Sequence, residues 1–247
     1  MVSPALEGLF RSLRVYHGDK AHHVAMDRLY GRFLKPGQLA FDIGAHVGDR
    51  ISSFRRLGAR VVALEPQPLA VRALRLIHGR DPNVTLLPAA CAKEMGRLRL
   101  RINSRNPTVS TGSEAFVAAA AGAGGWEGQT WDTEMDVPAV TLDLLVAAHG
   151  APDFVKIDVE GCEDAVLGGL SRPLPALSFE FTTIQRDVAF RCLDRLAALG
   201  PYRFDVALGE SQSLTFNRWI ARQDMVSHIR DLAHEANSGD IYAVLAD

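Results

Sequence analysis

A turn rich in glycine follows a predicted buried strand, in the run FDIGAHVG of residues 41–48. Ligands of open parallel sheets bind at the carboxyl ends of the strands, and Gly44 lets the backbone approach such a ligand closely. Gly48 allows the next helix to pack tightly, and the start of that helix offers free N–H groups to a carboxylate. The run therefore predicts a binding turn, with an ordinary tight turn between strand and helix as the alternative.

The spacing of the two glycines indicates which ligand to expect. The pattern is GxxxG rather than GxGxxG, and His46 stands where a dinucleotide-binding turn has the glycine that admits a pyrophosphate. This favours S-adenosylmethionine (SAM), which carries a methionine carboxylate instead. We expect Asp42 and Gly44 to shape the methionine end of the cofactor site, and His46 and Gly48 to hold the carboxylate.

An acidic residue closes the next predicted strand, about 20 residues further on. Glu65 can accept hydrogen bonds from both hydroxyls of a ribose, with Pro66 and Ala90 flanking the adenine. Enzymes that bind NAD place an acid similarly, so Glu65 alone does not separate SAM from NAD. A solvated carboxylate at a strand end is a further alternative.

A third group of charged residues lies in the run KIDVEG of residues 156–161. Strand alternation places Lys156, Asp158 and Glu160 on one face. Three charges on a core strand are costly unless they are paired or lie near the solvated end, so we expect them to border the cofactor pocket. Glu180 would add a carboxylate to the same rim. The alternative is a structural ion pair of Lys156 with Asp158 beside an exposed Glu160.

The elements that must position these residues alternate between short apolar runs and helical stretches. Strands are predicted at 39–44, 61–66, 84–90, 97–102, 137–142, 153–161, 176–182, 202–208 and 240–247, and helices at 3–15, 21–34, 47–58, 68–79, 143–150, 162–170, 184–200 and 221–239. Apolar strands in βαβαβ order indicate a parallel sheet with helices on both faces. We therefore predict an α/β, Rossmann-like fold in residues 37–247, with a mostly parallel, twisted sheet of seven strands, preceded by a helical segment in residues 1–36.

Residues 103–135 form the least regular part of the chain, rich in glycine, alanine, serine and threonine. A long irregular insertion in a compact domain is usually functional or disordered, so we predict a mobile substrate loop that closes over the acceptor. Trp126 and Trp131 would serve either as parts of that lid or as anchors that hold the loop on the core.

Six segments, taken in order, resemble the FkbM family of SAM-dependent methyltransferases: DIGAHVGDR, VVALEPQP, VTLLPAA, TLDLL, VKIDVEGCEDAVLGGL and SFEF, within residues 37–182. The most specific are KIDVEG followed by Glu163, and the LEP at Glu65. The resemblance implies a class I methyltransferase fold and O-methylation of a hydroxyl on a sugar, glycan or other secondary metabolite. The family often has Asn where this chain has His46, a residue that could titrate and make cofactor affinity depend on pH.

Methyl transfer to a hydroxyl is helped by a general base. The candidates, in order, are Asp158, Glu160 and Glu180, with Lys156 orienting one of these carboxylates or the acceptor. The same carboxylates could hold Mg²⁺ as an alternative, but no histidine or cysteine spacing is typical of a metal site, and we expect no metal. The rival functions are an NAD-dependent oxidoreductase and a SAM-binding module without catalysis.

Composition narrows the partners and the location. The 247 residues carry a formal net charge of −2 and no long basic run, so we expect a small-molecule hydroxyl acceptor rather than a nucleic acid. No apolar stretch approaches the roughly 20 residues of a membrane span, and the N-terminus lacks the apolar core of a signal peptide. Cys91, Cys162 and Cys192 lie far apart, as reduced thiols do, so we expect a cytoplasmic protein.

Overall fold

Seven strands form the main sheet, in the order β3-β2-β1-β7-β8-β10-β9. The computed structural model describes residues 3–246. The bounds of these strands are β1 Leu39–Ile43, β2 Arg60–Leu64, β3 Val84–Leu87, β7 Phe154–Ile157, β8 Ala176–Thr182, β9 Tyr202–Leu208 and β10 Ser238–Leu245. Neighbouring strands are parallel except for the two pairs that β10 makes. The predicted mostly parallel sheet of seven strands is therefore confirmed.

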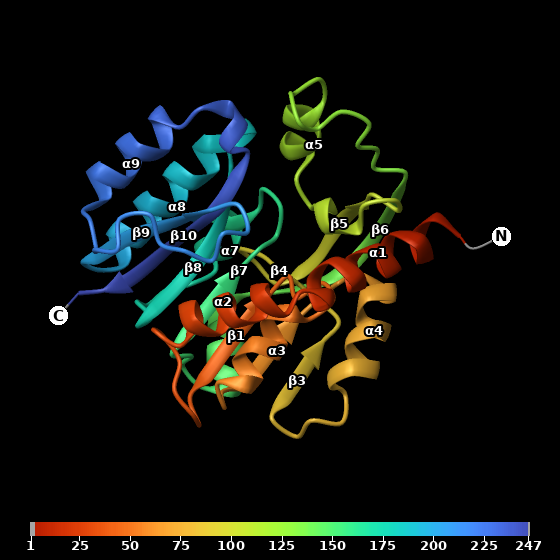
Figure 1. The fold of residues 1–247 in the computed structure, drawn as a ribbon, viewed down its shortest axis with the longest axis horizontal. Helices are drawn as coiled ribbons and strands as arrows, with labels where there is room; N and C mark the ends of the chain where they lie inside the picture. The colour runs from red at the N-terminus through yellow and green to blue at the C-terminus, as the bar shows by residue number, and fades with distance from the viewer. Residues whose placement is uncertain (1–2, 247) are drawn as a thin grey trace.

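The strand order reverses at β1 (Figure 1). From β1 the chain runs outward through β2 and β3 on one side, and it later places β7 and β8 on the other. The loops that leave the carboxyl ends of β1 and β7 therefore diverge, and open α/β sheets bind their ligands in the crevice at this point. The glycine turn of residues 44–48 follows β1 directly and lies at the crevice.

Helices cover both faces of the main sheet (Figure 1). Their bounds are α1 Pro4–Gly18, α2 Lys20–Tyr30, α3 Asp49–Arg56, α4 Pro68–His78, α6 Leu142–His149, α7 Glu163–Gly168, α8 Arg186–Leu199 and α9 Arg222–Asp231. One apolar cluster joins the sheet to α2, α3 and α4 through residues such as Phe54 and Leu74. The cluster on the opposite face joins it to α6, α7, α8 and α9 through residues such as Leu193 and Ile229. The layered arrangement expected from the βαβαβ pattern is thus present.

The two helices before the sheet begin at residues that cap them. The side chains of Ser3 and Asp19 accept hydrogen bonds from N–H groups of the first turn, which have no partner inside a helix. α2 buries Met26 and Tyr30 in the apolar cluster under the sheet, whereas α1 contacts α4 and the insertion. Of the helices in residues 3–246, none has the length and apolar character needed to cross a membrane.

A second sheet of three strands lies beside the main one, in the order β4-β6-β5. Its strands are β4 Ala90–Cys91, β5 Gly96–Ile102 and β6 Thr133–Val140. The predictions that residues 137–142 rejoin the main sheet and that residues 84–90 form one strand are therefore wrong. In β6 only the alternate residues Val137 and Ala139 are buried, a pattern typical of a sheet with one exposed face rather than of a strand covered by helices on both sides.

The insertion of residues 103–135 has a small apolar cluster of its own. It contains the 3-10 turn η1 Pro107–Val109 and the helix α5 Glu114–Ala120. Trp126 packs edge-on against Phe116, with ring centroids 5.2 Å apart, and its Nε1 donates a hydrogen bond to Asn237. Trp131 Nε1 donates to the carbonyl oxygen of Val109. These contacts favour the anchor role for both tryptophans, and movement of the segment on binding stays a prediction.

Three predicted elements end four or more residues earlier in the structure, and one of them is the helix expected over residues 21–34, which is α2 and ends at Tyr30. The strand expected over residues 153–161 is β7, which ends at Ile157 because the chain turns at Glu160 and Gly161, both with positive φ. The helix expected over residues 221–239 is α9, which ends at Asp231. The residues from Ser238 onward pair with β8 and β9 as β10. Helical periodicity cannot reveal this pairing, since it depends on strands far away in the sequence.

Candidate active site

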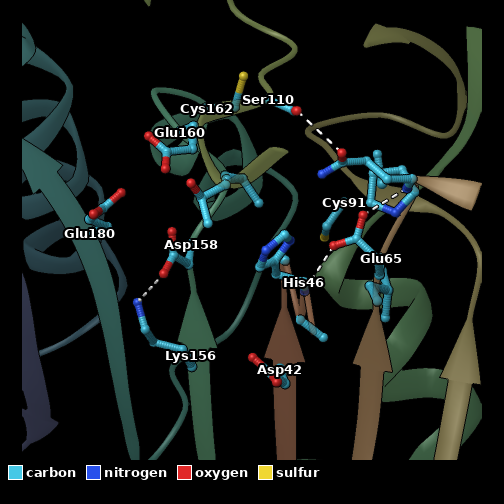
Figure 2. A pocket seen from close by; sticks show the side chains of 18 of the residues that line it. Asp42, His46, Glu65, Cys91, Ser110, Lys156, Asp158, Glu160, Cys162 and Glu180 are labelled. Atoms are coloured by element: carbon cyan, nitrogen blue, oxygen red, sulfur yellow. Dashed lines mark hydrogen bonds and ion pairs between the residues drawn. The ribbon is translucent and has the colours of Figure 1, made fainter. Parts of the chain in front are cut away.

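A cavity of about 1030 Å³, counting its open mouth, lies over the carboxyl ends of β1, β2, β7 and β8 (Figure 2). The predicted site residues that line it are Asp42, Gly44, His46, Glu65, Pro66, Ala90, Lys156, Asp158, Glu160 and Glu180. Among the predicted residues, Gly48 alone does not border this cavity.

Backbone geometry requires glycine at both positions of the turn. Gly44 has a φ of +91°, and a Cβ there would lie 1.8 Å from the carbonyl oxygen of Asp158, so the two chain segments approach too closely for any side chain. Gly48 has a φ of +83°, and a Cβ there would lie 2.6 Å from Leu74 in α4. The N–H of Gly48 already donates to the carbonyl oxygen of Ala45. Gly48 therefore packs α3 against α4, and its N–H is not free to hold a carboxylate.

His46 is held in the turn by its backbone rather than by its ring. Its N–H donates to Glu65 Oε2 at 2.9 Å, and the ring lies edge-on against Tyr16 of α1. Both ring nitrogens are buried and have no hydrogen-bond partner within residues 3–246. Burial lowers the pKa of His46 to about 4. The ring is thus neutral at neutral pH, and the pH dependence expected from its titration moves to acidic conditions.

The carboxylate of Glu65 is fixed at the end of β2 by two backbone N–H groups. Those of His46 and Gln67 donate to its two oxygens at 2.9 and 2.7 Å. The side chain is almost fully buried, and this burial raises the pKa of Glu65 to about 7. A carboxylate oxygen can accept more than one hydrogen bond, so both oxygens keep capacity for donors that enter the cavity. Next to it, Ala90, Leu98 and other apolar groups give the cavity an apolar wall.

Asp42 presents an unpaired acceptor to the cavity. It lies on β1 opposite Lys156 of β7, it is 2% exposed, and its Oδ2 has no partner within the described residues. Burial raises the pKa of Asp42 to about 7. Because buried polar atoms rarely lack a partner, the orphaned oxygen is suited to a ligand group that donates a hydrogen bond.

Lys156 forms the centre of a buried ionic group. Its Nζ donates to Asp158 Oδ2 at 3.1 Å, a contact visible in Figure 2, and to Asp240 Oδ1 at 2.7 Å. Burial raises the pKa of Asp158, but the Lys156 ammonium, the Arg50 guanidinium and side-chain hydrogen bonds together outweigh it and hold the pKa below its usual range. The ion pair of Lys156 with Asp158, which the sequence left as an alternative to a site role, is present, and Asp158 also borders the cavity as expected for the site.

Glu160 and Glu180 complete an acidic rim with Asp158 (Figure 2). One oxygen from each of the three carboxylates lies within 4.8 Å of the others. Glu160 is placed by the turn after β7 rather than by strand alternation, which corrects the predicted reason for its position. Burial and then neighbouring carboxylates raise the pKa of both Glu160 and Glu180. Oxygen ligands at this spacing suit the cation alternative, and the absence of a metal stays a prediction.

Several residues that border the cavity were not predicted from the sequence. The charged and aromatic ones among them are Tyr16 of α1, Asp49 and Arg50 of α3, and Glu210 in the loop after β9. The Arg50 guanidinium is paired with Asp49 and, at 3.0 Å, with Glu210. Asp49 and Arg50 directly follow the glycine turn, and charged residues at that position were a usable signal. Tyr16 and Glu210 come from segments without any motif, so only the fold brings them to the cavity.

The fold and the site together define a class of protein. A mostly parallel sheet whose strand order reverses at β1, with a glycine turn after β1 and helices on both faces, defines a doubly wound α/β protein with a ligand crevice at the reversal point. Within that class, the chain belongs to the methyltransferase FkbM domain family, whose model matches residues 42–218. The family predicted from the sequence motifs is therefore confirmed.

Solved structures of other methyltransferases resemble the whole chain. An O-methyltransferase from Bacillus cereus in complex with SAH is 12% identical, with 97% of this chain and 90% of that chain covered and a TM-score of 0.49. A TehB-like SAM-dependent methyltransferase from Corynebacterium glutamicum is 9% identical, with coverages of 96% and 94% and a TM-score of 0.48. Likenesses this distant carry no information about the acceptor. No curated protein matches the chain.

Proposed function

We propose that this protein is a SAM-dependent O-methyltransferase that acts on a hydroxyl of a small molecule, such as a sugar, a glycan or a secondary metabolite. Its membership of the FkbM family supports methyl transfer. The observation that best supports SAM as the cofactor is the position of Glu65. Two backbone N–H groups fix its buried carboxylate at the wall of the cavity. A carboxylate held in this way is preorganised to accept hydrogen bonds from the two hydroxyls of a ribose.

The other groups around the cavity fit the remaining parts of SAM. The unpaired oxygen of Asp42 suits the ammonium of the methionine end, and the turn at Gly44 brings the backbone close to that end. Pro66 and Ala90 belong to the wall next to Glu65 and would flank the adenine. SAM supplies a methyl group on a sulfonium, which is already activated, so the protein contributes mainly position and exclusion of water.

Asp158 is the strongest candidate for the general base. Its side chain is 31% exposed at the cavity, and Lys156 keeps it ionised at neutral pH. Glu160 and Glu180 hold their protons more strongly, since their pKa values are raised. The raised pKa makes these two carboxyl groups less readily ionised than Asp158 and more suited to donating a hydrogen bond to an acceptor. The order of candidates predicted from the sequence is kept for this reason.

Calorimetry with S-adenosylhomocysteine (SAH) and with NAD tests the cofactor directly. We expect SAH to bind in the micromolar range or more tightly, and NAD to bind far more weakly, because the turn has His46 where NAD needs a glycine. Equal affinity for both ligands would favour the oxidoreductase alternative. If SAH binds but no hydroxyl compound in a panel of sugars and secondary metabolites is methylated, the chain is a SAM-binding module without catalysis on that panel.

A further inference from the structure

Asp240 lies beside the candidate base Asp158, although the two residues are 82 positions apart in the sequence. It is near the start of β10 and pairs with Glu180 of β8. Because β10 runs antiparallel to β8, its start lies at the same edge of the sheet as the carboxyl ends of the parallel strands. The topology therefore brings Asp240 close to the acidic rim, and no motif in the sequence marks it.

Asp240 and Asp158 share one ammonium group. Lys156 Nζ lies 2.7 Å from Asp240 Oδ1 and 3.1 Å from Asp158 Oδ2. The lysine side chain is 1% exposed, so water does not screen its charge. The ammonium therefore forms ion pairs with both carboxylates at once. The side chain of Asp240 is 9% exposed and does not line the cavity, whereas that of Asp158 is 31% exposed and does.

Charged and titratable groups from every neighbouring element surround this trio. These groups are Arg50 of α3, Asp42 of β1, Glu160 in the turn after β7, Glu180 of β8, Tyr30 of α2 and Tyr242 of β10. Among these groups and the trio itself, Lys156 alone is in hydrogen-bond contact with both aspartates. A change of charge at Asp240 therefore acts on Asp158 both directly, through the repulsion between the two carboxylates, and through the ammonium that they share.

We propose that Asp240 is a positioning residue for the catalytic carboxylate, which binds Lys156 from the side away from the cavity and so keeps Asp158 both oriented and basic. The proposal rests on the proposed function, in which Asp158 accepts the hydroxyl proton. Without Asp240, the lysine would pair with Asp158 alone. The Lys156 ammonium would then stabilise the Asp158 carboxylate more strongly, because an opposite charge nearby favours the ionised form. Asp158 would therefore have a lower pKa and be a weaker base.

The expected size of this effect follows from the geometry. The two carboxylate oxygens contact the same nitrogen, so they are at most about 6 Å apart. Two unit charges at that distance, at the effective dielectric constant of about 20 that suits buried sites, change a pKa by about two units. We therefore expect the titration midpoint of Asp158 to fall by about two pH units in Asp240→Asn.

NMR titration of protein labelled with ¹³C at the aspartate carboxyl carbons tests the proposal without SAM or an acceptor. The Asp158 signal is assigned from its loss in Asp158→Asn. Asp205→Asn is the matched control, since Asp205 is also a buried aspartate, lies on the neighbouring strand β9 and accepts its hydrogen bonds from Val206 and Phe216 rather than from Lys156. We expect the Asp158 midpoint to move down in Asp240→Asn, to stay in Asp205→Asn and to return in Asp240→Glu.

A structural role alone would lower the melting temperature of Asp240→Asn and leave the Asp158 midpoint where it was, and this result would overturn the proposal. If Asp240→Asn does not fold, the unaltered protein supplies the test. Its Asp158 curve should then show a second inflection at the midpoint of Asp240, and a single smooth transition would also overturn the proposal. Failure of SAH to bind would instead reject the proposed function, and it would leave these midpoints unchanged.

Discussion

Replacing Glu65 with alanine tests the cofactor site most directly. The change removes a buried carboxylate that borders the cavity and that we propose receives the two ribose hydroxyls. Hydrogen bonds to a charged group contribute about 1.5–3 kcal/mol each, part of which water returns when the hydroxyls are left free. We expect SAH affinity to fall by about 1–3 kcal/mol, which is roughly 5- to 150-fold.

The same substitution has a cost to the fold that must be separated from binding. In Glu65→Ala the N–H groups of His46 and Gln67 lose their acceptor, and each buried donor without a partner costs about 1–3 kcal/mol. Glu65→Gln keeps the shape and one acceptor oxygen, so we expect a smaller loss of both stability and affinity. Glu134→Ala is the control, because Glu134 is 51% exposed on β6 and does not line the cavity.

Isothermal calorimetry with SAH, well below the melting temperature of each variant, measures the affinities. Thermal melting of the same samples shows which variants are folded. We expect the affinities to follow the order unaltered protein and Glu134→Ala, then Glu65→Gln, then Glu65→Ala. A folded Glu65→Ala that binds SAH as tightly as the unaltered protein would refute the assignment of Glu65 to the ribose.

Four further predictions concern the base, the insertion, pH and metals. Asp158→Asn should lower turnover by roughly 10²–10⁴-fold at saturating SAM with little change in SAH affinity, and near-normal turnover would move the base to Glu160. Hydrogen exchange in residues 103–135 should slow when cofactor and acceptor are both bound, and slow exchange in the free protein would identify a purely structural segment. Burial raises the pKa of Glu65 from 4.5 to about 7, so the folded protein binds more protons than the unfolded chain between these values, and this group's contribution to the free energy of unfolding falls as the pH rises through that window. In denaturant titrations at about pH 5 and 7, the difference in the free energy of unfolding between unaltered protein and Glu65→Gln should therefore change with pH. The same difference at both pH values would contradict the raised pKa. EDTA should leave SAH binding and turnover unchanged, while a loss that Mg²⁺ restores would establish a cation at the acidic rim.

Local patterns in the sequence predicted the parts of the site that lie at strand ends. Asp42, Gly44 and Glu65 border the cavity as expected, because a parallel sheet places the carboxyl ends of its strands at one edge whatever the rest of the chain does. Lys156 and Asp158 also lie there, within hydrogen-bond distance of each other. In each case the residue type and its distance from an apolar run carried the information.

Other features depended on contacts between distant segments, and the sequence alone could not indicate them. Strand alternation predicted that Glu160 borders the cavity, and it does. The reason differs, because β7 ends at Ile157 and a turn places the Glu160 side chain there. The alternating pattern of residues 97–102 and 137–140 was visible, but an apolar face does not say which sheet it joins. That choice was made by the antiparallel pairing of β5 with β6.

The charge state of the site was decided in the same way. Each carboxylate of the rim is an ordinary acid in the sequence, and its tendency to hold a proton depends on burial and on which charges face it. Lys156 opposes burial at Asp158, whereas carboxylates around Glu160 and Glu180 add to it. The lysine receives its second partner, Asp240, from an antiparallel strand near the end of the chain. Sequence alone determined which acids stand at the strand ends, and tertiary structure decided which of them is ionised, because burial and neighbouring charges exist only once the sheet has assembled.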